Sequence, residues 1–373
     1  MSRLELKELY AGFRDAGVIK ALSKQISKEA ERLCEPLCIM EVCGGHTHTI
    51  MKYGLKQLLP QSIEFVHGPG CPVCIMPKER IDQAIALSGM KNLILVTLGD
   101  MLYVPGSLST LAKERAQGCD VRALYSPMDA LAIALQNPDK TVVYFAIGFE
   151  TTTPMTAALL QQAQEKGIKN LLFHINHVLV PPAVDAIMQD GEARVNAFIA
   201  PSHVSVISGA KIYRGICENY ATPVVVSGFE PVDVMQSIAM IVRQKNEQRC
   251  ELEIEYSRCV TMEGNLKAQE MIEKYMKPRE NFRWRGVGDI PFSALELKVE
   301  FEGYDAEKIF ASQLPSQEID DHKLCICAKI LKGLANPEEC SVFGTACTPN
   351  QPLGSCMVSS EGSCNAYYRY AQV

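Results

Sequence analysis

Short apolar runs that end in Gly-, Pro-, His- or Asp-bearing turns recur along the chain, and segments with helical periodicity lie between them. This alternation of strands and helices predicts parallel sheets. Because the runs form two sets of four, we expect the α/β fold class, with two Rossmann-like parallel-sheet domains over residues 1–135 and 136–245. An amphipathic helix is predicted over residues 1–33. The runs cover residues 37–48, 63–74, 93–101 and 121–130, and then 141–152, 170–182, 197–209 and 222–233.

The pattern changes after about residue 245. A charged stretch with one predicted strand and one predicted helix leads into a tail that is rich in Gly, Pro, Ser and Asn. The tail has too few periodic apolar residues to build a core alone, yet it holds six of the fifteen cysteines. Small segments of this kind are commonly organised around a bound metal centre. Residues 246–373 are therefore predicted to form a smaller C-terminal iron–sulfur cluster domain.

Residues capable of chemistry follow the predicted strands directly. In open α/β sheets, functional groups gather beyond the carboxyl ends of the strands. For the Glu and His residues taken one at a time, helix capping and satisfaction of backbone groups remain the alternative interpretation. The residues at these positions are Cys43, His46, His48, Cys71, Cys74, Asp100, Glu150, His177, His203 and Glu230.

The composition narrows the classes of function. The chain has 373 residues, a net charge of −6 and no long Lys/Arg run, so nothing indicates a surface for nucleic acid or an anionic membrane. No secretory leader and no apolar stretch long enough to span a bilayer is recognisable, and we expect a cytoplasmic protein. Fifteen cysteines in a reducing compartment indicate metal, cluster or redox chemistry rather than a disulfide framework.

The tail cysteines suit a metal cofactor. Four soft thiolates on irregular loops fit a [4Fe–4S] cluster, a structural zinc ion or, more simply, buried thiols. The remaining pair can form an accessory disulfide beside a cluster or serve as small buried apolar side chains. The predicted cluster ligands are Cys327, Cys340, Cys347 and Cys364, and the predicted accessory pair is Cys325 and Cys356.

Two further cysteine motifs lie in the first predicted domain. Cys71 and Cys74 form a Cys-x-x-Cys pair, which favours a redox dithiol over half of a metal site or two buried thiols. Cys43 and His46 lie in CGGHTH, where the glycines let the backbone approach a ligand closely. This second motif fits either a metal site or a cysteine nucleophile activated by histidine.

Taken together and in order, EVCGGHTH, HGPGCPVC, FAIGFETT, APSHVS, SGFEPVD and CMVSSEGSCNAYY resemble the HypD family of [NiFe]-hydrogenase maturation proteins over essentially the whole chain. The resemblance implies a protein that works with the chaperone HypC and holds iron while two cyanides and one carbon monoxide are attached. It implies that cyanide arrives from HypE, with HypF upstream, and that the hydrogenase large subunit is served indirectly.

The resemblance also implies roles for individual residues. Cys43 becomes the iron-binding thiolate with His46 as a neighbouring contributor, and Cys71 and Cys74 become the redox pair. It supports the tail assignment of a [4Fe–4S] cluster with an accessory disulfide. Glu150, His203 and Glu361 complete the candidate site.

The resulting hypothesis places iron at Cys43 in a cleft between the two α/β domains, with Cys71 and Cys74 exposed to that cleft. Cleaving the sulfur–carbon bond of a thiocyanate takes two electrons, which a dithiol delivers when it closes to a disulfide. Two rivals stay open. One is a cysteine-nucleophile hydrolase or transferase that uses Cys43 and His46 and has a structural zinc tail. The other is an assembly scaffold without redox turnover, so whether the chain is an enzyme is undecided.

Overall fold

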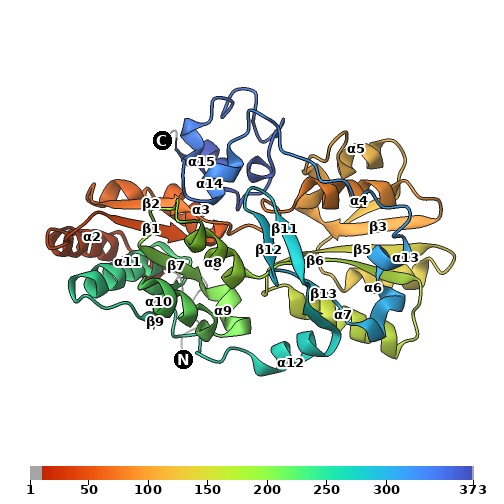
Figure 1. The fold of residues 1–373 in the computed structure, drawn as a ribbon, viewed down its shortest axis with the longest axis horizontal. Coiled ribbons are helices and arrows are strands. Elements are labelled where there is room, and N and C mark those ends of the chain that lie inside the picture. The colour runs from red at the N-terminus through yellow and green to blue at the C-terminus, as the bar shows by residue number, and fades with distance from the viewer. Residues whose placement is uncertain (1–10, 372–373) are drawn as a thin grey trace.

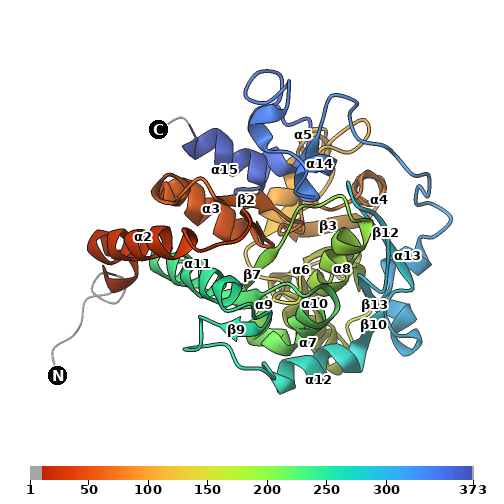
Figure 2. The ribbon, with the colours of Figure 1, turned by 60° about the vertical axis from the view of Figure 1, so that its left-hand side comes forward.

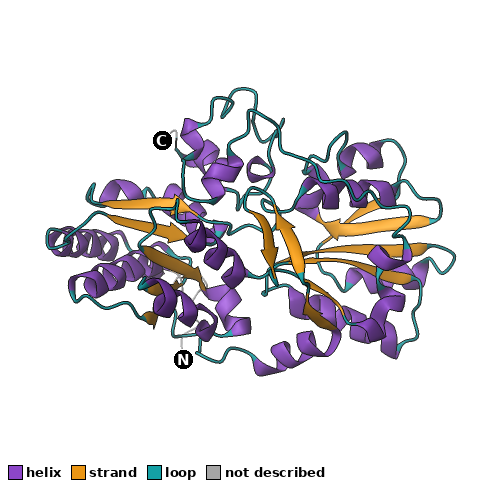
Figure 3. Cartoon of the chain, viewed as in Figure 1, coloured by secondary structure: helices purple, strands orange, loops and turns teal. Residues whose placement is uncertain are grey.

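The structure is a computed structural model that describes residues 11–371, and it contains two separate parallel sheets (Figures 1 and 3). The first sheet has the strand order β2-β1-β7-β8-β9, and every neighbouring pair in it is parallel. Its inner strands are almost wholly buried, as expected for a sheet covered on both faces. The strands are β1 (Leu37–Glu41), β2 (Ile63–His67), β7 (Ala197–Pro201), β8 (Val224–Ser227) and β9 (Leu252–Ile254).

The second sheet has the order β4-β3-β5-β6 and is also parallel throughout. Its two central strands are mostly apolar and buried, and this composition lets both faces pack against helices. The strands are β3 (Leu93–Leu98), β4 (Val121–Leu124), β5 (Thr141–Gly148) and β6 (Leu171–His177). The α/β class and the parallel sheets are therefore confirmed.

The grouping of strands differs from the prediction. The two sheets were expected to hold four consecutive strands each, whereas β1 pairs with both β2 and β7, and β3 to β6 form the second sheet between them. The chain thus leaves the first sheet after residue 67 and returns at residue 197. A division at residue 135 separates strands of both sheets. Apolar strands of similar length do not indicate which strand they pair with. The order of the strands along the chain therefore did not predict which sheet each strand joins.

Helices cover both sheets and connect them (Figure 2). The amphipathic helix predicted near the N-terminus is α2, which packs along α11, while residues 1–10 of that prediction lie outside the described residues. No helix within the described range is long and apolar enough to cross a membrane. The helices up to residue 246 are α2 (Ala16–Ala30), α3 (Gly44–Lys52), α4 (Lys78–Ser88), α5 (Leu111–Ala116), α6 (Asp129–Gln136), α7 (Thr153–Glu165), α8 (Val180–Asp190), α9 (Ser202–Ser208), α10 (Arg214–Tyr220) and α11 (Pro231–Asn246).

The chain after residue 246 first ties the two sheets together. Strand β9 completes the first sheet, whereas α12 packs on α7 and β13 contacts β6 of the second. The strand pairs β10–β13 and β11–β12 are antiparallel. These elements are α12 (Leu266–Tyr275), β10 (Met276–Pro278), β11 (Asn281–Trp284), β12 (Gly288–Pro291), β13 (Leu295–Leu297) and α13 (Ala306–Ile309).

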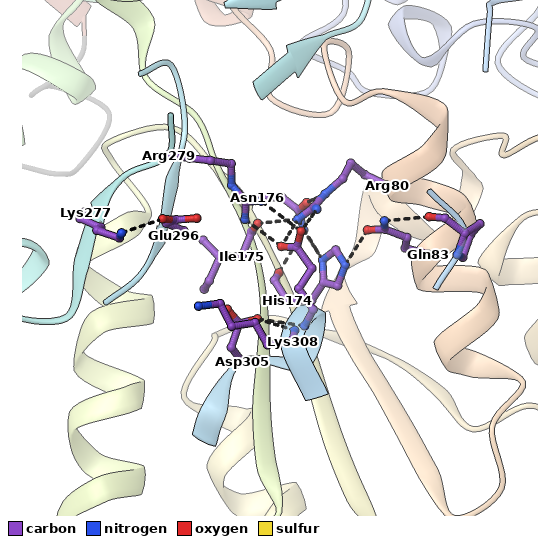
Figure 4. A network of polar contacts seen from close by, with 12 residues as sticks. Arg80, Gln83, His174, Ile175, Asn176, Lys277, Arg279, Glu296, Asp305 and Lys308 are labelled. Atoms are coloured by element: carbon purple, nitrogen blue, oxygen red, sulfur yellow. Dashed lines mark hydrogen bonds and ion pairs between the residues drawn. The ribbon is translucent and has the colours of Figure 1, made fainter. Parts of the chain in front are cut away.

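A buried ion network fixes this region to the second sheet (Figure 4). The Glu307 carboxylate accepts two hydrogen bonds from Arg80, at 2.5 and 2.9 Å, and two from Arg279, at 3.0 and 2.8 Å. Arg80 also donates to Asn176 Oδ1 at 2.6 Å, next to His174 on β6. Bidentate pairs of this kind fix geometry as well as charge, so α4, β6 and α13 are held in one arrangement.

The cysteine-rich tail has short helices and, among the described residues, no strand beyond isolated bridges. Its longest helix, α15, packs on α3 beside the first sheet (Figures 1 and 2). Its apolar residues belong to the same buried core as those of both sheets. The tail helices are α14 (Cys327–Leu331) and α15 (Ser363–Tyr370), and the 3-10 turns of the chain are η1 (Gly12–Arg14), η2 (Leu55–Leu58), η3 (Gly99–Tyr103), η4 (Ala210–Tyr213), η5 (Val299–Tyr304), η6 (Pro337–Glu339) and η7 (Ser355–Met357).

Candidate functional site

Cys43 lies at the junction between β1 and α3, where an extended backbone turns into the helix. Its backbone N–H donates to Glu41 Oε2 at 3.2 Å. Burial raises the pKa of the Cys43 thiol well above its ordinary value, and the Glu361 carboxylate adds to this, against backbone N–H groups of Gly45 and His46 that lower it. A thiolate at this position therefore needs a compensating positive charge, such as a bound metal ion.

Glycines let three segments meet around Cys43. A Cβ at Gly44 would lie 1.9 Å from the Glu361 carbonyl oxygen of the tail. A Cβ at Gly70 would lie 2.3 Å from the backbone nitrogen of Cys43. No larger residue fits at either position without moving backbone. The glycines of CGGHTH and HGPGCPVC thus bring the Cys43 turn, the Cys-x-x-Cys turn and the tail into direct contact, so the close approach made here is to protein backbone, and the predicted approach to a ligand stays a prediction.

Two histidines contact Phe229 beside this junction: His46 is buried, and His203 is half-buried. The His46 ring stacks on the Phe229 ring with their centroids 4.6 Å apart. The His203 ring lies tilted against the same Phe229 ring, with their centroids 5.1 Å apart. Since His46 Nε2 faces two carbonyl oxygens, of Ser227 at 3.3 Å and Gly228 at 3.1 Å, it must carry the proton. Burial lowers the pKa of His46 to about 3 and that of His203 to about 4. Both rings are therefore neutral, and the Nδ1 atom of each has no partner within residues 11–371.

A cavity of about 470 Å³ opens where the ends of the two sheets and the tail meet. Of the predicted site residues, His203 and Glu361 line it, and Asp100 faces the same space. Burial raises the pKa of the Glu361 carboxyl, and Asp100 raises it further. Cys43 lies behind the Gly70 wall rather than on the lining. The cavity wall is completed by residues 70, 72, 73, 98, 99, 147–149, 151, 152, 359 and 360.

Glu150 follows β5 and is buried next to this cavity without lining it. Its Oε1 accepts from the Val180 backbone N–H at 2.9 Å, which ties β5 to the start of α8. Its Oε2 has no hydrogen-bond partner in the described part of the chain. Burial raises the pKa of Glu150 to about 7. The backbone contact matches the capping alternative, while the second oxygen remains able to bind a proton near neutral pH.

Cys71 and Cys74 are buried, with exposed fractions of 3% and 1%, so the expectation that they are exposed to the cleft is wrong. Pro72 and Val73 between them face the cavity instead. The turn is closed by the Cys74 backbone N–H, which donates to Cys71 Sγ at 3.2 Å. Neither cysteine lines the cavity, and Cys74 Sγ instead contacts Ser355 and Cys356 of the tail.

The thiols form a row of contacts into the tail. Cys74 contacts Cys71 on one side and Cys356 on the other, and Cys356 contacts Cys327. Hydrogen bonds from Cys327 and Cys74, aided by the Arg285 charge, lower the pKa of Cys356 to about 6 against the effect of burial. These contacts therefore favour the thiolate form at Cys356. Because thiolates attack disulfides, this arrangement permits exchange between the Cys-x-x-Cys turn and the tail.

Five of the six tail cysteines line one small apolar cavity together with Ile326, Ile330, Val342, Phe343 and Met357. The described residues contain no group of three or more His, Cys, Asp or Glu side chains arranged to hold a metal ion. The cavity nevertheless matches a four-thiolate cluster in donor chemistry, since its polar atoms are sulfurs and its remaining wall is apolar. Cys327 lies 3.2 Å from Cys325 and contacts Cys364. The five cysteines are Cys325, Cys327, Cys340, Cys347 and Cys364.

Comparison with known proteins identifies the family. The sequence model described as "HypD: Hydrogenase formation hypA family" matches residues 17–371. The chain belongs to the HypD family. It is 48% identical to the "Hydrogenase expression/formation protein HupD" of Azotobacter chroococcum, over 96% of both chains, and 48% identical to the "Hydrogenase maturation factor HypD" of Azotobacter vinelandii, again over 96% of both. The corresponding factor of Escherichia coli K12 is 42% identical, over 95% of this chain and 94% of its own. The family resemblance drawn from the motifs is confirmed.

In this HypD family member, sequence reasoning missed the residues that join the motifs. Arg285 is buried. Its backbone N–H donates to the Ile75 carbonyl oxygen at 2.8 Å, and its guanidinium group donates to Ser355 Oγ and to the Asp321 carboxylate. Ser355 Oγ in turn donates to the Cys74 carbonyl at 3.0 Å. An arginine in an ordinary strand–turn segment carries no signal of this role. The Glu41 and His67 side chains were also missed, although both end strands next to the cysteine motifs.

Proposed function

We propose that this chain assembles the iron–cyanide–carbonyl group of a [NiFe] hydrogenase, with HypC as the protein that shares the iron and HypE as the source of cyanide. The observation that carries the proposal is that the Cys43 turn, the Cys71–Cys74 turn and the tail meet beside one cavity whose lining presents His203 and Glu361, while the buried Cys71 and Cys74 thiols behind that lining continue into the tail thiols. The iron is cargo, held by the Cys43 thiolate. The unprotonated Nδ1 of His46, which no described residue occupies, is a nearby candidate for the same site.

Release of cyanide from a thiocyanate fits the thiol row. The carrier S–C bond breaks, the carbon leaves as cyanide and the carrier sulfur becomes a thiol. Cys71 and Cys74 lose two electrons and two protons as their disulfide forms, so one proton goes to the carrier sulfur and one to a base. Glu150, with a pKa near 7, and neutral His203 are the candidate bases. Four tail thiolates would hold a [4Fe–4S] cluster, which would pass two electrons, one at a time from an external one-electron carrier protein, to the Cys71–Cys74 disulfide, and two protons from solvent would complete the dithiol.

The contacts bear on which tail thiols ligate the cluster. A cluster with four thiolate ligands needs only four of the five cysteines in this cavity, so one of the five is not a ligand. Among them, Cys327 is the cysteine whose side chain hydrogen-bonds to Cys356. This favours a Cys327–Cys356 accessory pair over the Cys325–Cys356 pair expected from the sequence. The ligands would then be Cys325, Cys340, Cys347 and Cys364 in place of the set that includes Cys327.

Two serine variants separate these assignments. If Cys325 is a ligand, Cys325→Ser loses iron and visible absorbance after anaerobic reconstitution, whereas Cys327→Ser keeps both. The opposite result restores the assignment made from sequence. Unchanged iron in both variants and in a Cys340→Ser, Cys347→Ser double variant would refute a thiolate-ligated cluster in the tail. Cys217→Ser, a buried cysteine outside the tail, is the control for general effects of thiol loss.

The decisive test of the whole function is infrared spectroscopy of the chain co-purified anaerobically with HypC. Wild type is expected to show cyanide and carbon monoxide bands, Cys43→Ala to lose them, and Cys217→Ala to keep them. Bands retained in Cys43→Ala would refute the role of Cys43. Metal analysis of the same sample separates the rival hydrolase, which predicts zinc without iron. The geometry already disfavours that rival, because no imidazole hydrogen bond to the Cys43 thiol is present in the described range.

The scaffold rival is tested at the dithiol. Redox turnover predicts that Cys71→Ser abolishes maturation of the hydrogenase large subunit while the folded protein still binds HypC. Full maturation with Cys71→Ser would leave only a docking role. The row of buried thiols favours turnover, since a pure scaffold has no use for sulfur contacts that face away from the surface.

A further inference from the structure

A chain of buried hydrogen bonds runs beneath Cys43 and has no part in the function proposed above. Glu41 and His67 are the last residues of β1 and β2 and are direct partners in the parallel register. Their exposed fractions are 1% and 0%. His67 Nδ1 lies 2.5 Å from Glu41 Oε1, and the Glu41 carboxylate also accepts from Thr47 Oγ1 and the Cys43 backbone N–H. Such donors are what a buried carboxylate requires.

The chain continues into the tail. His67 Nε2 lies 3.0 Å from the hydroxyl of Tyr367, and the two rings meet edge-on at 5.2 Å. Tyr367 lies on α15, one helical turn after Cys364. An ionised Glu41 carboxylate can only accept, and in that state His67 Nδ1 carries the proton and donates it to this bond. An unbroken path of hydrogen bonds therefore links the backbone of Cys43 to the tail helix, across 300 residues of sequence between His67 and Tyr367.

Other contacts make α15 and the start of α3 a single packed unit. The Gly44 backbone touches the Glu361 carbonyl, and the His48 ring meets Tyr370 edge-on at 5.1 Å. Both contacts join the tail around α15 to α3, which follows Cys43 directly. A movement of α15 cannot occur there without moving the Cys43 turn, because interiors at this packing density transmit displacement rather than absorb it.

We propose that Glu41, His67 and Tyr367 are positioning residues that hold the Cys43 turn to the tail helix, so that the direction of Cys43 Sγ depends on the placement of α15. The proposal rests on the proposed function only where Cys43 is taken as the iron thiolate. The hydrogen-bonded coupling itself stands independently of any cargo. Its consequence is that ordering of the tail around Cys364 also sets the geometry at Cys43.

The test compares Tyr367→Phe with Tyr275→Phe in the full-length chain. Tyr367→Phe removes the hydroxyl and keeps the ring that packs on His67. The control also removes one hydroxyl from a wholly buried tyrosine, which contacts Gln164 Oε1 at 3.4 Å in a different part of the core. Amide hydrogen exchange is read on the peptide over residues 41–47. We expect it to accelerate about five-fold in Tyr367→Phe, the factor for one hydrogen bond of about 1 kcal/mol, and to stay unchanged in the control.

The second measurement is the frequency of the cyanide and carbon monoxide bands in the complex with HypC. A loss of stability alone lowers band intensity, whereas a changed thiolate geometry moves the band positions. We expect displaced bands in Tyr367→Phe and wild-type positions in Tyr275→Phe. Unchanged exchange over residues 41–47, equal acceleration in the control, or bands that stay in place overturns the proposal. If wild type shows no bands, the proposed function fails, and hydrogen exchange alone decides the coupling.

Discussion

Replacing Glu307 by Gln should lower the free energy of unfolding by weakening the attachment of the C-terminal region to the second sheet. One carboxylate pairs with two buried guanidinium groups, and the side chains of Arg80, Arg279 and Glu307 are 7%, 19% and 21% exposed. Gln keeps the shape but removes the charge, leaving two buried cations with no ionic partner. Removing one member of a buried pair costs about 3–5 kcal/mol, and the remaining exposure of Glu307 places the expected loss near 3 kcal/mol.

The sign of the pH dependence follows from the same contacts. Although burial disfavours its charge, the guanidinium groups of Arg80 and Arg279 hold the pKa of Glu307 far below its ordinary value of 4.5. A carboxyl with a depressed pKa in the folded state stabilises the fold above the unfolded pKa, and this contribution is lost as the pH falls below it. The difference between wild type and Glu307→Gln should therefore be full at pH 7 and shrink below pH 4.5.

Urea unfolding followed by tryptophan fluorescence measures the effect, because the single tryptophan, Trp284, is buried on β11 close to the network. The control is Glu302→Gln, which removes an exposed carboxylate paired with Lys308, at 42% and 47% exposure. That change should cost less than about 1 kcal/mol. Equal losses in the two variants, or a loss from Glu307→Gln that persists undiminished at pH 4, would refute the reasoning.

Two further predictions concern the site. Relative to wild type, Glu150→Gln should gain up to about 3 kcal/mol of stability as the pH rises from 4.5 to about 8. The reason is that burial raises the pKa of Glu150 to about 7, so the wild-type fold loses stability as this carboxyl deprotonates. A stability difference that is the same in urea unfolding curves at about pH 5 and about pH 8 contradicts this. Gly44→Ala should cost about 1–3 kcal/mol in urea unfolding, since its Cβ would overlap the Glu361 carbonyl, while Gly303→Ala, which meets nothing within 4 Å, should be nearly neutral; similar costs would show that the tail yields without strain.

Local features of this chain were predictable from its sequence, since they depend on neighbouring residues. The strands at Leu37–Glu41 and Ile63–His67 are where apolar runs end in glycine turns, and Cys43 does lie at a strand-to-helix junction. The pairing of β1 with β7 was not predictable, because it depends on a surface formed by residues that are more than 150 positions apart. The sequence pattern specified the strands but not their partners.

The site shows the same division. The presence of a dithiol at Cys71 and Cys74 follows from spacing, whereas its inward direction depends on Cys356, almost 300 residues later. Glu41 offers a sharper case. A carboxylate at the end of an apolar strand is typical of an exposed strand end, and only the His67 and Thr47 donors make its burial possible. Buried polar groups are predictable only when their partners are known, and here one partner, Tyr367, lies beyond His67 in the tail.

The tail is the part whose order depends most on the rest of the molecule. It has no sheet of its own among the described residues, and its buried side chains share one core with both sheets. Its docking contacts are concentrated at α3 and the Cys-x-x-Cys turn, through α15, Glu361 and Ser355. A segment with so little internal core gains order from whatever binds its thiols and from the surface on which it rests. These two sources act on the same helix, α15, so the proposed cofactor at Cys364 and the proposed iron at Cys43 would be bound by elements that stabilise each other. Loading of the tail should then precede stable binding of iron at Cys43, because α15 must be in place before the Cys43 turn is fixed.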